Sequence, residues 1–182
     1  MLEFLSHLLA AVCGQSPGHT WAPGGMLLPC CQRCTGLYAG AGVAALLHLW
    51  LRPKLSSRFL ELHGAFLLAM VPFGFHWVAQ GPALRTLVGA LFGFGVVAFL
   101  RLPLRRGAGE RPRCSSSWGY WLGLMGTLII LPLAAGRGGV AAAYLLSGLI
   151  ACGMLALGSL VLAVVGGALR WLRRLPDRRL AA

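Results

Sequence analysis

Two cysteines form a C-x-x-C pair, Cys31 and Cys34, at the point where the chain enters an apolar stretch. This position puts Cys34 at or near a helix N-terminus, where unpaired N–H groups and the helix dipole stabilise a thiolate. Arg33 places a fixed positive charge between the two thiols. Both effects lower a thiol pKa, as in redox-active C-x-x-C pairs, so the pattern indicates a reactive dithiol.

The same spacing is also half of a zinc or iron site, which needs about four ligands. Cys13, Cys30 and His19 lie nearby in the sequence and are candidates to complete such a shell. A third interpretation is a structural disulfide, because extracytoplasmic thiols tend to be oxidised or metal-bound. The four cysteines allow three disulfide connectivities, and the sequence does not choose among them. We expect Cys13, Cys31 and Cys34 to act as a unit, with Cys30 pointing elsewhere or pairing with Cys13 instead. The redox, metal and disulfide interpretations of this unit remain open.

A second set of polar residues is expected at the same level as the cysteines, at the ends of apolar stretches. Ionisable groups at such positions suggest function by default. Together they predict an outer polar pocket of cationic character, suited to a quinone carbonyl, a carboxylate or a lipid headgroup. Its members are Arg33, Tyr38, His76, Gln80 and Arg85.

A third set, His48, Glu61 and His63, is expected at the opposite end of the apolar stretches. These side chains could pair with one another or with Arg52 and Arg58. A haem held by His48 and His63 is possible in principle. Two histidines at one interface are more often simple interfacial residues, which is the interpretation preferred here.

The elements that position these residues are membrane helices. Hydrophobic residues make up 58% of the 182 residues and charged residues only 11%, whereas soluble domains carry roughly 25% charged residues. Five stretches approach the length of about 20 residues that a helix needs to cross the bilayer. The predicted fold is therefore an all-α polytopic bundle of five transmembrane helices, at residues 35–51, 60–79, 82–102, 118–135 and 140–169.

The net charge of +12 indicates topology rather than nucleic-acid binding. All but three of the 16 Lys and Arg residues fall on one side of the predicted spans, and the exceptions are Arg33, Arg85 and Arg137. The positive-inside rule then puts the N-terminal segment outside and the C-terminus in the cytoplasm. The expected location is the cytoplasmic membrane.

Residues 1–13 are apolar but too short to cross the bilayer, and they lack the basic start and cleavage site of a signal peptide. We expect a short amphipathic helix at the outer interface or folded against the bundle. The predicted organisation is thus an outer segment at 1–34, a membrane bundle at 35–171 and a basic cytoplasmic tail at 172–182.

Two pairs of glycines, Gly36/Gly40 and Gly89/Gly93, have the spacing that allows helices to pack closely in a membrane.

The cysteine segment resembles the hallmark of a family of small prokaryotic membrane proteins, domain of unknown function 2085. That hallmark has a C-H-x-x-P element followed by P-x-C-x-R-C-T-G-x-Y-x-G, and the similarity continues around the second and third spans. Gly14 departs from the usual His, so if the family site binds a metal through that His, His19 would have to replace it here. His76 stands where an Asp is common. The resemblance implies topology and the site's location, but no reaction. Matching residues are Cys13, Pro17, Pro29, Cys31, Arg33, Cys34, Thr35, Gly36, Tyr38, Gly40, Pro72, Gln80, Arg85, Gly89 and Gly93.

Two functional hypotheses follow from the sequence. In the first, the protein is a membrane thiol oxidoreductase or metal-handling protein, with zinc or a quinone as the candidate cofactor and a cysteine cluster outside the cytoplasm. In the second, it is a non-catalytic accessory subunit of a larger membrane complex, and a disulfide staples its outer segment. The lipid bilayer is the expected partner in both.

Overall fold

Helices make up every regular element of the computed structural model, which describes residues 2–75, 77–108 and 118–173. A short helix α1 (Leu2–Ala10) and two 3-10 turns, η1 (Pro17–His19) and η2 (Pro23–Gly25), come first. Five long helices follow: α2 (Gln32–Trp50), α3 (Ser57–Gly74), α4 (Pro82–Ala108), α5 (Trp118–Arg137) and α6 (Val140–Arg173). The predicted all-α fold is confirmed.

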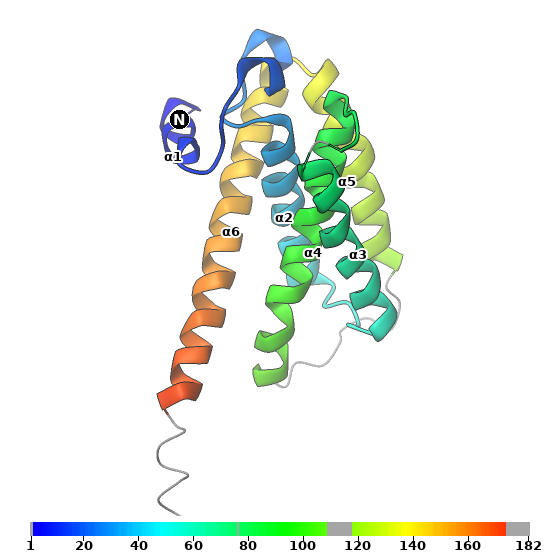
Figure 1. Ribbon diagram of the computed structural model, residues 1–182, viewed down its shortest axis with the longest axis vertical. Helices are drawn as coiled ribbons and strands as arrows, with labels where there is room; N and C mark the ends of the chain where they lie inside the picture. Colours follow the sequence, from blue (N-terminus) through cyan, green and yellow to red (C-terminus); the bar gives the residue numbers. More distant parts are fainter. Residues whose placement is uncertain (1, 76, 109–117, 174–182) are drawn as a thin grey trace, which may run out of the picture.

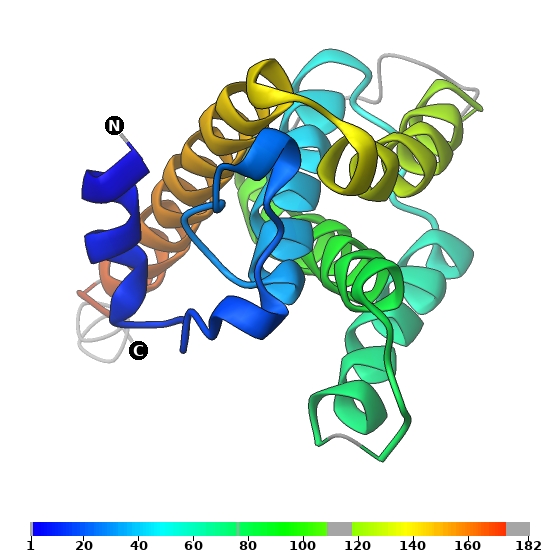
Figure 2. The same cartoon turned by 90° about the horizontal axis from the view of Figure 1, so that it is seen from above.

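The five long helices run side by side and alternate in direction, as Figure 1 shows. We call the end at which α2, α4 and α6 begin the upper end, and the opposite end the lower end. Helix α2 lies in the middle of the bundle, where it packs against α4, α5 and α6, and α3 packs against α4 (Figure 2). Helix α1 lies on the outer side of α6, at the upper end.

Three of the long helices are long and apolar enough to cross a membrane by length and composition: the stretches Pro82–Leu104, Trp118–Arg137 and Val140–Leu172. The prediction of five such spans is therefore confirmed only in part. Helix α2 falls short because it begins with Gln32 and Arg33 and is rich in glycine, and α3 because it carries Arg58, Glu61 and His63. A central helix such as α2 needs less apolar surface, since neighbouring helices rather than lipid cover most of it.

Glycines bring the backbones of α2 and α4 into direct contact. A Cβ atom at Gly36 would collide with the backbone of Thr86, and one at Gly40 would lie 2.7 Å from the Ala90 carbonyl oxygen. On α4, a Cβ atom at Gly89 would likewise collide with the Arg33 carbonyl oxygen of α2. The predicted role of these glycines in helix packing is confirmed.

The N-terminal helix α1 has 9 residues, which gives a length of about 14 Å, so it cannot cross roughly 30 Å of hydrocarbon. Leu5 and Leu9 are buried, and Leu9 packs in one cluster with Ile150 of α6. This agrees with the expected short helix folded against the bundle. Leu8 and Val12, by contrast, are exposed.

The close approach of α2 and α4 predicts the effect of adding a single methyl group. Gly89→Ala should destabilise the fold by about 1–3 kcal/mol or more, because the new Cβ can be accommodated only if the two backbones separate. Gly126→Ala is the matched control, since no atom lies within 4 Å of its added Cβ. That change should be neutral or stabilising by up to about 1 kcal/mol. Denaturant unfolding in detergent measures both, and equal effects of the two variants would contradict the packing argument.

Candidate thiol site at the upper end

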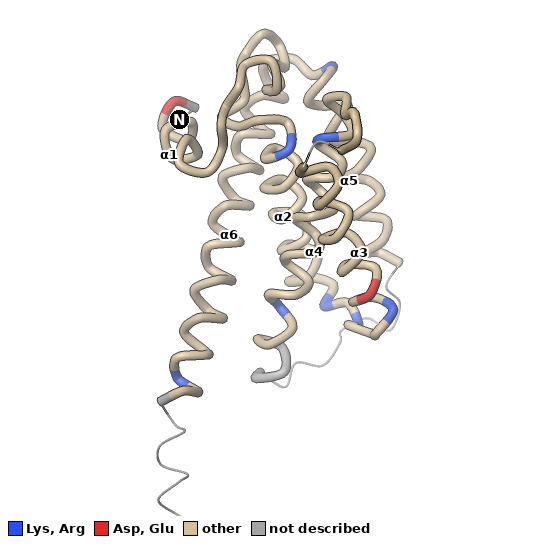
Figure 3. The backbone as a smooth tube through the Cα atoms, in the orientation of Figure 1, with Lys and Arg blue, Asp and Glu red and all other residues tan. Residues whose placement is uncertain are grey.

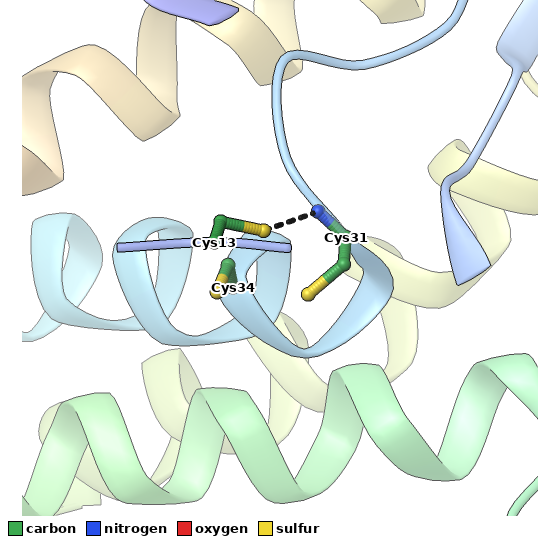
Figure 4. Close-up of side chains that lie close together, drawn as sticks. All are labelled: Cys13, Cys31 and Cys34. Carbon is green, nitrogen blue, oxygen red and sulfur yellow. Dashed lines mark hydrogen bonds between the residues drawn. The ribbon is translucent and has the colours of Figure 1, made fainter. Parts of the chain in front are cut away.

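Three cysteines from two distant segments meet at the upper end of α2. The Sγ atoms of Cys13, Cys31 and Cys34 all lie within 4.8 Å of one another (Figure 4). The backbone N–H of Cys31 donates a hydrogen bond to Cys13 Sγ at 3.2 Å. All three are free thiols, with Cys13 buried and the other two partly buried.

Helix geometry positions Cys31 and Cys34. Cys31 is the N-cap of α2, with extended backbone angles, and its carbonyl oxygen accepts the N–H of Thr35 at 2.8 Å. Cys34 lies in the first turn, three residues later, and residues at that spacing are neighbours on one helix face. The predicted position of the pair at a helix N-terminus is confirmed.

Cys13 reaches the pair because the outer segment folds back across the bundle. The N–H of Cys13 donates to Leu9 O at 2.8 Å at the end of α1. Gln15, which has a positive φ of 43°, donates its side-chain amide to Ser6 O at 2.6 Å and to Pro29 O at 3.0 Å. The indole N–H of Trp21 donates to Thr86 Oγ1 of α4 at 2.8 Å, which attaches the loop to the bundle.

Two other candidate ligands lie beside the cluster but outside it. Cys30 is fully buried, and its Sγ lies 3.5 Å from Thr35 Oγ1. His19 is exposed in η1 and shares a hollow with Cys31. Among the residues that the structure describes, the group of converging sulfur atoms contains Cys13, Cys31 and Cys34 only.

The two adjacent thiols Cys30 and Cys31 differ in acidity. A hydrogen bond from the Cys34 thiol lowers the pKa of Cys31 to about 5; the backbone N–H groups of Cys34 and Arg33 act in the same direction, and burial opposes them. Burial raises the pKa of Cys30 to about 12. At neutral pH, Cys31 is therefore a thiolate and Cys30 a neutral thiol.

The expected outer polar pocket is only partly assembled. Arg33 and Arg85 line one hollow together with Cys31, Gln32 and His19. Gln80 instead accepts a hydrogen bond from Arg33 Nη2 at 3.3 Å. Tyr38 packs against the cluster that contains Cys13 and Cys30. His76, the remaining member of the predicted set, lies outside the described residues.

Arg33 and Gln80 cap the end of α3. Arg33 Nη2 donates to Phe73 O at 2.9 Å, and Gln80 Nε2 donates to the same oxygen at 2.6 Å. Carbonyl groups in the last turn of a helix have no partner within the helix, and a cation there is favourable. These two side chains therefore fix α3 to the first turn of α2.

Of the polar residues expected at the opposite end, His48 and His63 lie in a buried aromatic cluster at the lower end, and Glu61 does not. His63 is fully buried, and its Nδ1 and Nε2 lie 2.8 Å from Phe59 O and 2.7 Å from the Tyr120 hydroxyl. His48, also buried, places its ring edge-on to that of Tyr120, with centroids 5.3 Å apart. Glu61 is exposed and does not join them. Both ring nitrogens of His63 are engaged, so the arrangement leaves none for a haem iron.

Sequence reasoning missed Tyr120, which links α5 to His63 of α3. A buried tyrosine usually finds a partner for its hydroxyl group. Tyr120 is 1% exposed and lies near the start of a predicted span. That requirement could have paired it with a histidine at the same end of the bundle.

Residues 13–99 match the model of the family described as "Predicted membrane protein (DUF2085)". The family resemblance is thereby confirmed over slightly less than half of the chain. The matched part includes the three-cysteine cluster, helices α2 and α3, and most of α4. No curated protein and no solved structure matches the chain. Family and fold together define a helical membrane protein whose activity the family description does not state.

The acidity of Cys31 gives a pH-dependent prediction. In metal-free protein, alkylation of Cys31 should persist on acidification and fall only as the pH passes below about 5, whereas an ordinary thiol with a pKa of about 8.5 is largely protonated at pH 7. Cys34→Ala removes the side-chain donor and should move the midpoint upward. Cys152→Ala, an exposed cysteine on α6, should leave it unchanged. Mass spectrometry of iodoacetamide-labelled peptides gives the midpoints, and a value above pH 7 in the unsubstituted protein would refute the argument.

Proposed function

We propose that Cys13, Cys31 and Cys34 form a thiolate site for a soft metal ion, with Zn²⁺ the first candidate, at the outer mouth of a membrane helix bundle. The observation that carries the proposal is the convergence of three sulfur atoms within 4.8 Å of one another. One of them comes from a segment 18 residues before Cys31 in the chain. A dithiol pair alone does not require this third thiol.

The distances suit a common metal centre. Zinc–sulfur bonds are about 2.3 Å long, so two thiolates on a tetrahedral zinc ion lie about 3.8 Å apart. Metal ligation requires deprotonated thiols. Cys31 is already acidic, and the nearby guanidinium groups of Arg33 and Arg85 favour negative charge at this end. Three thiolates leave one tetrahedral position for a further ligand, the pattern of zinc sites that act on a substrate.

A second candidate function is thiol–disulfide exchange, which the acidity of Cys31 favours. A thiolate at a helix N-terminus with a second thiol one turn later is the arrangement of dithiol reductants. Cys31 would attack a disulfide of a partner, forming a mixed disulfide and releasing one partner thiolate. Cys34 would then attack the Cys31 sulfur and release the second partner thiolate. The partner's disulfide would be reduced to two thiols as the Cys31–Cys34 pair becomes a disulfide.

Metal binding by single variants separates these functions. The full-length protein should bind one Zn²⁺ per chain, and Cys13→Ser, Cys31→Ser or Cys34→Ser should each lower the affinity at least about a hundredfold, since even outer-shell changes cost 10–100-fold. Cys30→Ser and Cys152→Ser are matched controls and should bind normally. Competition with a chromophoric chelator measures the affinities, and Co²⁺ substitution reports thiolate ligation by its absorption.

Two other outcomes would reject the metal site. Absence of metal binding by the unsubstituted protein, together with a reversible Cys31–Cys34 disulfide that still forms in Cys13→Ser, would favour thiol exchange. If the unsubstituted protein binds no metal and contains a stable Cys13 disulfide, the cysteines are a structural staple, as the accessory-subunit hypothesis requires.

We further propose that all five long helices cross the cytoplasmic membrane of a prokaryote, with the cysteine cluster outside. Their alternating directions support this, because α2 and α3 lie between the same two levels as the three apolar helices (Figure 1). So does the charge distribution: among the described residues, Arg33, Arg85 and Arg137 are the only Lys or Arg residues at the upper end, and the others lie toward the lower end (Figure 3). An outer segment at 1–34 and a cytoplasmic tail at 172–182 complete this arrangement, although residues 174–182 lie outside those the structure describes.

Reporter fusions test the orientation. A fluorescent protein that folds only in the cytoplasm should be active when fused after Ala182, and alkaline phosphatase at the same place should be inactive. Fused between α3 and α4, after Gly81, the two reporters should show the opposite pattern. Active alkaline phosphatase at the C-terminus would overturn the proposed orientation.

A further inference from the structure

We propose that the hollow beside the cysteine cluster binds the carboxylate or phosphate group of an anionic ligand. The hollow has a volume of about 200 Å³ and is lined by Arg33, Arg85, Gln32, Gln15, His19 and Cys31, among others. Ligand pockets commonly measure about 300–1,000 Å³, so this one fits a small anionic group better than a large molecule.

An excess of positive charge in the hollow is the main observation. Arg33 and Arg85 lie in the first turns of α2 and α4, and Figure 3 shows basic residues close together at these helix starts. Their acceptors are neutral: Arg33 Nη2 bonds to Phe73 O and Gln80 Oε1, and Arg85 Nη1 bonds to Gln32 Oε1 at 3.3 Å. Two guanidinium groups in one hollow are a favourable site for a carboxylate or phosphate.

No carboxylate among the described residues lines this hollow. The described part of the chain contains two acidic residues, Glu3 and Glu61. Glu3 lines a different hollow, and Glu61 lies in α3 near its start at the lower end. Even with Cys31 counted as a thiolate, the two guanidinium groups leave one positive charge in the lining of the hollow. An external anion is the available partner for that charge.

A buried donor and two helix dipoles add to the argument. The Nε–H group of Arg33 is buried and has no hydrogen-bond acceptor among the described residues. Helices α2 and α4 both begin at this end, and helix N-termini carry partial positive charge that favours anions.

The position of Cys31 suggests what the anion does. Cys31 belongs both to the three-sulfur cluster and to the lining of the hollow. An oxyanion held by Arg33 and Arg85 therefore lies next to the proposed metal centre, where it can supply the fourth ligand. This role rests on the proposed metal site, whereas anion binding itself does not. The ligand class is thus a small acid, or a phosphate-bearing molecule, that can also coordinate a metal.

Titration of the metal-free, full-length protein in phosphatidylcholine nanodiscs tests anion binding. Calorimetry with inorganic phosphate, and separately with succinate, should show one site per chain for at least one of them. Arg85→Gln should weaken this binding at least about tenfold, because a hydrogen bond to a charged group is lost. Arg137→Gln is the matched control: it removes the same charge at the same end, outside the hollow, and should change the affinity less than about twofold.

A second experiment, with lipid, identifies the source of the phosphate group. Native mass spectrometry counts the phosphatidylglycerol molecules retained by the protein and by Arg85→Gln. Retention of one more lipid by the unsubstituted protein supports a lipid headgroup in the hollow. Equal retention, with calorimetric binding of free phosphate or succinate, supports a soluble ligand.

Cys13→Ser separates this inference from the proposed function. The variant lacks one proposed metal ligand but keeps the hollow, so it should bind the anion normally. Zinc binding by the unsubstituted protein without phosphate, succinate or Arg85-dependent lipid binding would overturn the anion site and leave the metal site standing. Anion binding without zinc binding would overturn the metal site and leave the anion site standing. Equal weakening by Arg85→Gln and Arg137→Gln would also overturn the anion site, since it would show only a general electrostatic attraction between the basic residues at this end and the anion.

Discussion

Direct backbone contact between α2 and α4 is the constraint on which the upper end of the molecule depends. Glycines on each helix face the backbone of the other: Gly36 and Gly40 on α2, and Gly89 and Gly93 on α4. Gly153 of α6 makes a similar approach to the Tyr38 carbonyl of α2. Association of helices in lipid depends on close packing of this kind, because apolar surface gains little by leaving an apolar solvent.

This contact determines the chemistry of the upper end. It brings the first turns of α2 and α4 together, and with them Arg33, Arg85 and the two cysteines of α2's N-terminus. Cationic side chains and helix N-termini surround thiols that can carry negative charge. A site that favours anions, thiolates and a metal ion's ligands follows from the way the two helices pack.

The lower end has a different character. Histidine and aromatic rings form its buried core, and the hydrogen bond between His63 and Tyr120 joins α3 to α5. Both partners are buried, so an unpaired polar atom there would be costly, and the pairing satisfies it. This arrangement explains polar residues within α3 without assigning them a ligand, and it fits a structural role for the lower cluster.

Sequence alone determined the class of fold and the location of the site. Apolar stretches located all five long helices, and the C-x-x-C spacing placed Cys31 and Cys34 at a helix start, because helix periodicity and N-terminal electrostatics are local properties. The sequence interpretation overestimated the number of strongly apolar helices, because it accepted α2 and α3 as spans despite their polar residues and, in α2, the many glycines. The sequence also predicted that Cys13 joins Cys31 and Cys34, but it left open whether Cys30 pairs with Cys13. Tertiary structure decided that Cys30 turns toward Thr35. It likewise decided that Gln80 lies outside the hollow of Arg33 and Arg85 while it bonds to Arg33, and that His63 meets Tyr120. The contacts between Cys13 and Cys31 and between His63 and Tyr120 join residues 18 and 57 positions apart. Spacing along the chain carries no information about how the N-terminal segment folds back or how the helices pack.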